Sequence, residues 1–568
     1  MSALSVQDVL GLAAQAKGLE GRLVAGLDLA GSALAGVRFV GAAVSGGCPG
    51  CANLSGADYT RALLDGANLT DASLAGSTLV NTVFSNAACV NASFRKATLQ
   101  QVMAVPGNIT AREPMEAMVP LAEAEIPDAL RAALQKLGIV GLVQKPTVFQ
   151  GADLAEAVIR QSVFDRARMT ALSFSGANLN DVRWEACELE DVDFGGGAYD
   201  DLAFTGGTLR GVRFRDVKLK KASFSGVALE DVSFAGARFE DVEFNGVDLT
   251  KVELPKNPRS TVFLECNLER RDFAQQELTE VAFEKSGLEG ATWSGATLRG
   301  CRFVESRLEE VVLDGATLRG GEFARCQAAR SSWKGAKFAE LAGGGSNLQD
   351  ADFSQATLDE VDLSEGNLNG TRWDGATLKA ADLSGSSLEG AGFAGSRWER
   401  VAAAQADLTT LGTLPDAFHK CALMKTVCTG LDLRGKNLTD CDFREANLAG
   451  ANLEGALADQ VDFSEANLEG AHLRQARLRA AAFIQANLRD ANLRRAEGPS
   501  AMFQEAELGG ADLSKANLER ANFTQARAKR AQFLGASLRF AIFANADVRA
   551  ADFRQADLRQ ANLHAARD

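Results

Sequence analysis

Histidine is scarce in this sequence, and so are the other features on which catalysis, metal binding and membrane insertion depend. Only 3 of the 568 residues are His, and no Ser-His-Asp, Cys-His or paired-carboxylate arrangement stands out from the background. We therefore predict no enzyme activity, no metal site and no cofactor. No run of 18 apolar residues occurs, so no helix is predicted to cross a membrane. The net charge of −14 argues against nucleic acid as a partner.

Aromatic residues are also few, but their placement is regular. The chain has 31 Phe, 5 Trp and 2 Tyr. From residue 440 it repeats a five-residue unit of the form A-(D/N)-(L/F)-x-x; we name the Leu/Phe the central position and the Ala the small position. Of the 38 aromatic residues, 37 lie at central positions, and Phe540 is the exception. A period of five fits neither an amphipathic helix nor a flat sheet, and predicts a chain that turns once per unit with both apolar positions inward.

A second period describes the cross-section of the turning chain. Phe443, Phe463 and Phe483 begin a series with a twenty-residue period, so four units should form one coil. Central positions run over 24–99, 149–254 and 263–563, which is 99 units and 87% of the chain. At the spacing of β-strands, about 4.8 Å, about 25 coils would form a rod about 120 Å long. One residue is missing from the register before Phe263, which predicts a break in the ladder at 255–262.

This pattern closely resembles that of the pentapeptide repeat family, over the same 87% of the chain. The resemblance implies an all-β fold, a right-handed quadrilateral β-helix of about 25 four-sided coils. We predict an N-terminal capping helix within 1–20, β-helix segments at 21–99, 149–254 and 263–568, a helical insertion at 100–148 and the register break at 255–262.

The segments outside the repeat suggest contact sites. Residues 4–17 should be helical, with Val6, Val9, Leu10 and Leu12 on an apolar side that covers the first coil. In the insertion, a helix is predicted from Pro127 to Gly138. It either packs on the coils or forms a docking arm for a partner. The residues of that arm would be Ile126, Leu130, Leu134 and Leu137.

The C-terminal coil carries no capping helix in the sequence, so we expect an open end that pairs with another copy, end to end, or with a partner. Residues 471–568 hold 16 basic and 10 acidic residues, in contrast to the acidic chain as a whole. This basic region is either a solvated surface or an interaction surface. The candidate interaction residues are Phe540, Arg539, Arg549, Arg554, Leu558, Arg559 and Leu563.

Most of the 10 Cys fall on inward positions of the repeat, where a thiol acts as a small apolar group. Only Cys48 and Cys51, in CPGC, lie elsewhere. They form either a turn with incidental thiols, which we favour, or a redox pair or half of a zinc site. The start of the chain lacks the pattern of a signal peptide, which favours a cytoplasmic protein with reduced thiols. Export by a system that needs no signal peptide stays open.

The function we favour is a non-catalytic rigid scaffold or adaptor that binds protein partners through its faces, its insertion and its open C-terminal end. The family resemblance implies two settings for large bacterial members: accessory proteins of contractile, type VI-like secretion systems, and secreted effectors. It also implies an alternative, a DNA-mimicking inhibitor or protector of DNA gyrase. Charge disfavours the alternative, because DNA carries one charge per about 1.7 Å, or about 70 over about 120 Å, whereas this chain nets −14.

Overall fold

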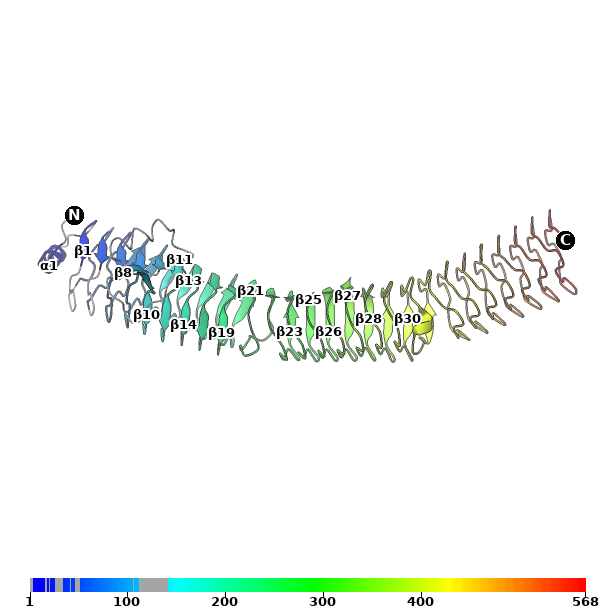
Figure 1. Ribbon diagram of the computed structural model, residues 1–568, viewed down its shortest axis with the longest axis horizontal. Coiled ribbons are helices and arrows are strands. Elements are labelled where there is room, and N and C mark those ends of the chain that lie inside the picture. The colour runs from blue at the N-terminus through cyan, green and yellow to red at the C-terminus, as the bar shows by residue number, and fades with distance from the viewer. Residues whose placement is uncertain are drawn as a thin grey trace. The chain divides into compact units, whose positions relative to one another are not determined.

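The computed structural model describes residues 4–15, 18–19, 21–25, 34–40, 42–45, 52–105, 107–111 and 141–568. The chain divides into two compact units, Met1–Leu268 and Glu269–Asp568. Each of these two compact units is an all-β solenoid, a stack of coils built from the five-residue repeat (Figure 1). The described residues contain one α-helix, α1 (Val6–Ala14).

Each five-residue unit turns at the two residues that follow its central position. The second of them has a positive φ in unit after unit, for example 61° at Glu465 and 64° at Gly450. The Asp or Asn before the central position stabilises the turn, because its side chain accepts a hydrogen bond from the backbone two residues later. Asp362 Oδ1 accepts from the N–H of Ser364 at 2.9 Å. This hydrogen bond explains why Asp or Asn recurs directly before the central position of the repeat.

The coils are joined by parallel backbone pairing at an offset of twenty in the sequence, as the repeat predicts. In the first unit Leu219 pairs with Phe239, and in the second Leu298 pairs with Leu318. After residue 419 the pairing continues as single bridges, such as Asp442 with Asp462. The offset of twenty confirms four repeat units between paired residues, while the handedness of the coil and the total of coils stay predictions.

The strands of the first unit are β1 (Leu23–Ala25), β2 (Ala43–Ser45), β3 (Leu63–Asp65), β4 (Thr78–Val80), β5 (Val83–Ser85), β6 (Thr98–Gln100), β7 (Met103–Val105), β8 (Gly107–Ala111), β9 (Gly141–Lys145), β10 (Val148–Gln150), β11 (Val158–Asp165), β12 (Arg168–Thr170), β13 (Asn178–Glu185), β14 (Glu188–Glu190), β15 (Ala198–Thr205), β16 (Thr208–Arg210), β17 (Lys218–Lys220), β18 (Ser223–Ser225), β19 (Ala228–Glu230), β20 (Arg238–Glu240), β21 (Val242–Asn245) and β22 (Thr261–Leu264). Those of the second unit are β23 (Glu277–Thr279), β24 (Ala282–Glu284), β25 (Thr297–Val304), β26 (Thr317–Ala324), β27 (Lys337–Gly344), β28 (Thr357–Val361), β29 (Thr377–Lys379), β30 (Arg397–Glu399) and β31 (Ala417–His419), with a short 3₁₀ helix, η2 (Leu408–Thr410).

Aromatic rings form the core in two arrangements. Rings at equivalent positions of paired coils stack face to face, as Phe194 does on Phe214 with centroids 4.7 Å apart and an interplanar angle of 10°. Rings half a coil apart in the sequence meet edge to face, as Phe204 does with Phe214 at 5.9 Å and 83°. Both geometries are favourable for aromatic pairs. The predicted columns of central residues are thereby confirmed.

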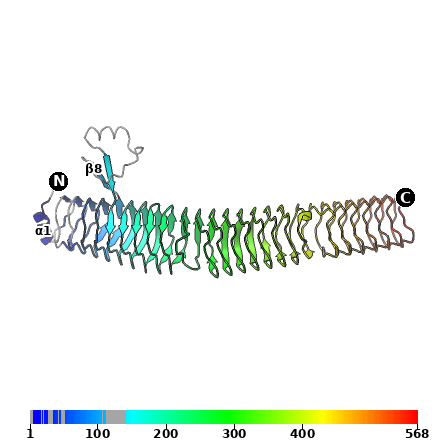
Figure 2. The ribbon, with the colours of Figure 1, turned by 60° about the horizontal axis from the view of Figure 1, so that its bottom comes forward.

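The insertion is narrower than the predicted 100–148. β7 still belongs to the ladder, because Met103 pairs with Val83 and Ala104 is fully buried at a central position. The prediction ended this segment at Leu99 because alanine does not mark a central position. β8 and β9 then pair antiparallel, and in Figure 2 β8 projects away from the stacked coils. The predicted insertion helix, with Ile126, Leu130, Leu134 and Leu137, lies outside the described residues.

The register break before Phe263 is confirmed, because Val242 pairs with Thr261 at an offset of nineteen. A second irregularity was not predicted. Gly392 pairs with Thr413 at an offset of twenty-one, next to η2, where Asp407 accepts a hydrogen bond from the N–H of Thr409. The regular offset returns at Trp398 and Phe418. The extra residue is thus compensated within one coil. The spacing of the central positions stays a multiple of five, so the sequence pattern does not reveal the irregularity.

Helix α1 is shorter than the predicted 4–17. Ser5 and Asp8 begin it by a reciprocal contact, in which Ser5 N–H donates to Asp8 Oδ2 at 2.9 Å and Asp8 N–H donates to Ser5 Oγ at 3.2 Å. Val9 is buried as expected, but Leu10, placed on the same apolar side by the prediction, is 37% exposed. The role of α1 as a cap stays a prediction.

Gly321 offers a test of the local geometry, because it occupies a small position where alanine is the rule. Its φ is 101°, and a Cβ there would lie 2.0 Å from the carbonyl oxygen of Cys301. We expect Gly321→Ala to lower the free energy of unfolding by about 2 kcal/mol or more, measured by urea denaturation. Gly315→Ala is the control, since Gly315 has a φ of 67° with nothing within 4 Å of a Cβ. Equal losses in the two variants would contradict the steric explanation.

Candidate interaction surface

Phe540, the one aromatic residue outside the central positions, lies on the surface of the second unit. It follows the central Leu538 by two positions, has a φ of 60° and is 37% exposed. Among the described non-glycine residues with positive φ it is the one aromatic. A bulky side chain is unusual in this conformation, and such positions often have a functional reason.

Two guanidinium groups lie against the exposed ring of Phe540. The Cζ of Arg520 is 5.7 Å from the ring centroid, and that of Arg539 is 5.8 Å from it. Both distances lie within the range of cation–π attraction. In the part of the chain that the structure describes, neither arginine forms an ion pair, and the buried Nε of Arg539 has no hydrogen-bond partner. The cluster therefore combines an apolar ring with two arginines that form no ion pair within the described residues.

Next to this cluster runs a side of the coils on which the residues directly flanking the central Phe are uncharged, while the exposed Glu505, two residues after Phe503, borders them. We name it the uncharged face, and it comprises the outward residues around the central Phe483, Phe503, Phe523 and Phe543. Ile542, which is 37% exposed, is joined to Asn522 by a bridge, and Asn522 in turn to Met502. The face thus presents apolar and neutral polar groups beside two arginines, Arg520 and Arg539, that form no ion pair within the described residues. Its residues are Ile484, Met502, Gln504, Asn522, Thr524, Ile542 and Ala544.

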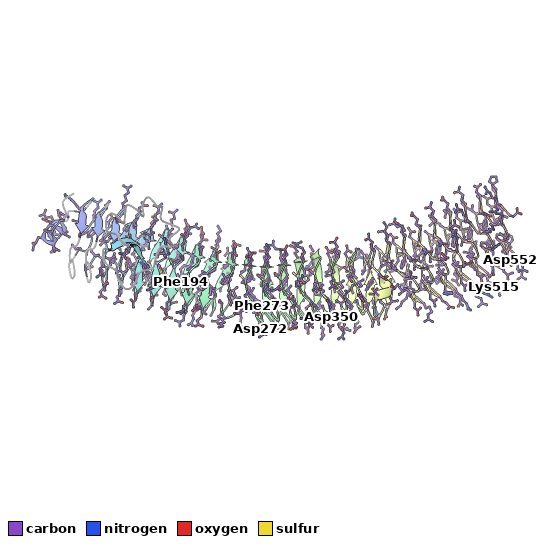
Figure 3. The ribbon with its side chains drawn as sticks, in the orientation of Figure 1. Phe194, Asp272, Phe273, Asp350, Lys515 and Asp552 are labelled. Atoms are coloured by element: carbon purple, nitrogen blue, oxygen red, sulfur yellow. The ribbon has the colours of Figure 1, made fainter. Side chains whose placement is uncertain are left out.

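The other predicted basic residues are neutralised locally. Arg549, Arg554 and Arg559 each pair with the Asp two positions earlier, at 2.6, 2.8 and 2.6 Å. The hydrogen bond from its arginine lowers the pKa of each of these carboxyl groups to about 2. One of them, Asp552, is labelled in Figure 3. These three arginines therefore offer less attraction to an acidic partner than Arg520 and Arg539 do.

The two predicted leucines differ in exposure. Leu558 is half-buried, and Leu563 is 45% exposed. Pairing through the C-terminal coil stays a prediction. Arg520 and Ile542 were not among the residues predicted for the candidate surface. The sequence could have indicated Arg520, because it precedes Phe540 by one twenty-residue period and the two residues therefore lie in neighbouring coils.

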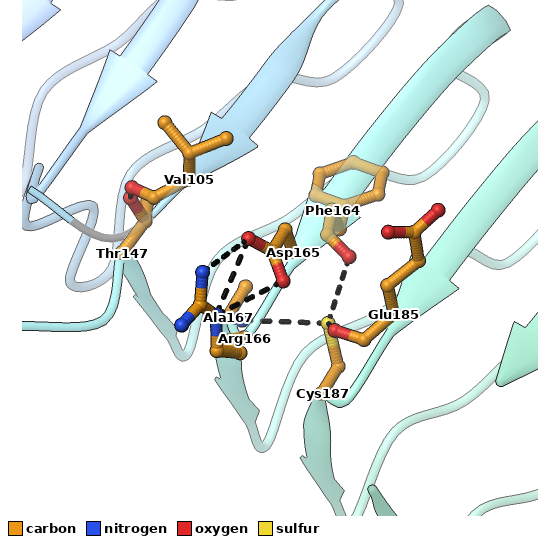
Figure 4. A network of polar contacts seen from close by, with 8 residues as sticks. All are labelled: Val105, Thr147, Phe164, Asp165, Arg166, Ala167, Glu185 and Cys187. Atoms are coloured by element: carbon orange, nitrogen blue, oxygen red, sulfur yellow. Dashed lines mark hydrogen bonds and ion pairs between the residues drawn. The ribbon is translucent and has the colours of Figure 1, made fainter. Parts of the chain in front are cut away.

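The described cysteines are buried thiols. Cys187 Sγ donates to the carbonyl oxygen of Phe164 at 3.0 Å and accepts from the N–H of Ala167 at 3.4 Å (Figure 4). Burial raises the pKa of Cys187 to about 12, so this thiol is not a nucleophile at neutral pH. Cys48 and Cys51 lie outside the described residues. The buried free cysteines are Cys89, Cys187, Cys266, Cys301, Cys326, Cys421, Cys428 and Cys441.

The described residues hold no group of three or more His, Cys, Asp or Glu arranged to bind a metal ion. No helix among them is long and apolar enough to cross a membrane.

Family models for pentapeptide repeats match more than half of the chain. The eight-copy model matches residues 51–86, 62–101, 147–183, 283–320, 294–327, 344–372, 357–395, 421–457, 459–497, 501–539 and 531–567. A nine-copy model matches residues 203–250. A search of curated proteins finds no match.

Several solved structures resemble parts of the chain. HetL, involved in heterocyst differentiation regulation in the cyanobacterium Nostoc, is 25% identical over 43% of this chain and 90% of its own, with a TM-score of 0.14. A pentapeptide repeat protein from the thylakoid lumen of Arabidopsis thaliana is 30% identical over 18% of this chain and 65% of its own, with a TM-score of 0.11. The plasmid-mediated fluoroquinolone resistance protein QnrB1 is 19% identical over 43% of this chain and 92% of its own, with a TM-score of 0.14.

Proposed function

The chain belongs to the pentapeptide repeat family, and from this membership we propose that it is a non-catalytic rigid scaffold or adaptor that binds a protein partner. In this proposal the coils are right-handed and four-sided, as the family resemblance implies. The observation that carries it is the Phe540 ring between Arg520 and Arg539 at the edge of the uncharged face. Exposed aromatic and arginine side chains are the residues most often found at the centres of protein interfaces.

The partner that this surface fits is a protein with an apolar patch next to acidic side chains. The apolar part would cover Phe540 and Ile542, which are both 37% exposed. Carboxylates would pair with the arginines, which lack ion pairs among the described residues, by charge-assisted hydrogen bonds. The predicted contacts through the insertion and the C-terminal coil remain part of the proposal, as does a role beside a contractile secretion system or as an exported effector.

Gyrase protection by DNA mimicry is the weaker candidate. The acidic stretch 181–254, with 16 acidic and 9 basic residues, is partly neutralised by ion pairs. Arg210 lies 2.7 Å from Glu230, and Lys218 lies 2.7 Å from Glu240. A mimic of DNA needs a dense array of free negative charges. Inhibition of DNA supercoiling by micromolar protein in a gyrase assay would favour the mimic over the scaffold.

A comparison of variants on immobilised full-length protein tests the scaffold proposal. We expect Phe540→Ala to reduce the amount of its specific partner retained from a cell extract by about tenfold, the loss typical of an interface hot spot of about 1–2 kcal/mol. Because free arginines contribute, retention should also fall as salt is raised. The amounts are measured by quantitative mass spectrometry.

Val427→Ala is the matched control, because Val427 belongs to the same unit and is also 37% exposed, but lies away from the uncharged face. It should retain the partner in the amount seen with the unaltered protein. Equal retention by Phe540→Ala and the unaltered protein would refute a partner site at this cluster.

A further inference from the structure

The register break of the first unit forms a cavity with a basic lining. Its volume is about 580 Å³, within the range of small-molecule sites. Strand β20 and the loop 255–260 line it together, with Lys218 from the neighbouring strand β17. The cavity therefore lies where the offset between paired residues changes from twenty to nineteen.

Two prolines hold the loop that borders this cavity. Pro255 and Pro258 are buried, while Lys256 between them is exposed. Proline has no backbone N–H and a fixed φ, so neither proline can donate a hydrogen bond to the ladder and the loop has few alternative conformations. The basic residues of the loop are thus presented from a restrained backbone, which lowers the entropy lost when a ligand binds.

Four cations and one carboxylate line the cavity. The carboxylate, Glu240, is 2.7 Å from Lys218 and 3.7 Å from Lys220, and the hydrogen bond from Lys218 holds its pKa below the usual range. The two lysines of β17 therefore neutralise the charge of Glu240.

The other three cations are uncompensated. In the described part of the chain, the side chains of Arg238, Lys256 and Arg259 form no ion pair and no hydrogen bond, although the backbone carbonyl oxygen of Arg259 accepts from Thr261 Oγ1 at 2.9 Å. Like charges gathered within a Debye length repel one another, so this arrangement costs folding free energy. It contrasts with the stretch 181–254, to which Arg238 itself belongs and in which acidic residues outnumber basic ones by 16 to 9.

We propose that this cavity, the register-break pocket, binds a small anion of the phosphate class through Arg238, Lys256 and Arg259. Arginine forks match the oxygen geometry of a phosphate, and a lysine adds a point charge. The three free cations suit a ligand with several negative charges, such as a diphosphate group. Phe239 is only 6% exposed and offers little ring surface for stacking, so recognition rests on the phosphates.

Isothermal titration of the full chain with sodium pyrophosphate, and separately with inorganic phosphate, tests this assignment. We expect one pyrophosphate per chain, bound more tightly than the single phosphate because it can meet all three cations. Arg259→Gln should weaken pyrophosphate binding about tenfold or more, as expected when a charge-assisted hydrogen bond is lost. Circular dichroism would verify that the variant is folded.

Arg215→Gln is the matched control, since Arg215 is an exposed arginine of the same unit that does not line the cavity. It should leave pyrophosphate binding unchanged. The proposal is overturned if pyrophosphate does not bind, if Arg259→Gln binds it as the unaltered protein does, or if both variants lose affinity equally. Binding of a short DNA duplex without binding of pyrophosphate would equally overturn it, in favour of a surface for nucleic acid.

Discussion

Phe503→Ala should lower the free energy of unfolding of the second unit by about 3–5 kcal/mol, the usual cost of deleting a buried Phe ring. Phe503 is fully buried. Its ring stacks on Phe483 at 4.9 Å and on Phe523 at 4.8 Å, with an interplanar angle of 2° on both sides. Removal would leave a cavity that the backbone ladder, fixed by hydrogen bonds on both sides, cannot close.

Hydrogen exchange is the measurement that locates this loss. A solenoid is stabilised mainly by contacts between neighbouring coils, so destabilisation should be largest in the coils adjacent to the substitution. We expect faster amide exchange at residues 483–523 and little change at 277–320. Phe540→Ala is the control, because its ring is 37% exposed and its loss should cost about 1 kcal/mol or less. A similar effect of both variants would contradict the assignment of the core.

Much of the fold could be predicted because one five-residue rule serves both local and long-range structure. The Asp or Asn that fixes each turn, the alanine at the small position and the large central residue recur together, so the pattern survives single exceptions. At two places the pattern misled the prediction, because the five-residue spacing continued although the side chain or the pairing changed. Ala104 continues the ladder without a large side chain. Around η2 the offset changes to twenty-one and returns to twenty by Phe418.

The surface was less predictable than the core, because the repeat leaves outward positions free. Net charge along the chain pointed to residues 471–568, but it could not show that Arg549 is neutralised by Asp547 while Arg520 lies on Phe540. The register-break pocket was missed for a related reason. The separation of Arg238 and Arg259 in the sequence is a multiple of neither the five- nor the twenty-residue period, so neither period brings them together. Only the altered offset does.

The buried thiols should make the second unit sensitive to alkaline pH. Burial raises the pKa of Cys301 to about 11 and that of Cys326 to about 12, whereas an exposed thiol has a pKa of about 8.5. Above a pH of about 8.5 the unfolded chain releases these protons and the folded chain retains them. The stability is therefore present below the pKa of the unfolded state, and it is lost as pH rises toward the pKa of the folded state.

The loss amounts to about 1.4 kcal/mol per thiol for each pH unit above about 8.5, or about 2 kcal/mol per thiol at pH 10. The double variant Cys301→Ala/Cys326→Ala should escape this part of the loss. Both residues occupy small positions, where alanine is the commonest residue, so the variant should fold normally at pH 7. We expect the unaltered protein to lose about 4 kcal/mol more than the variant between pH 7 and pH 10 in urea denaturation. Lysines, arginines and the other thiols titrate alike in both proteins and cancel in the comparison. An equal loss in the two proteins would show that these thiols ionise without unfolding, which would contradict their burial in the core.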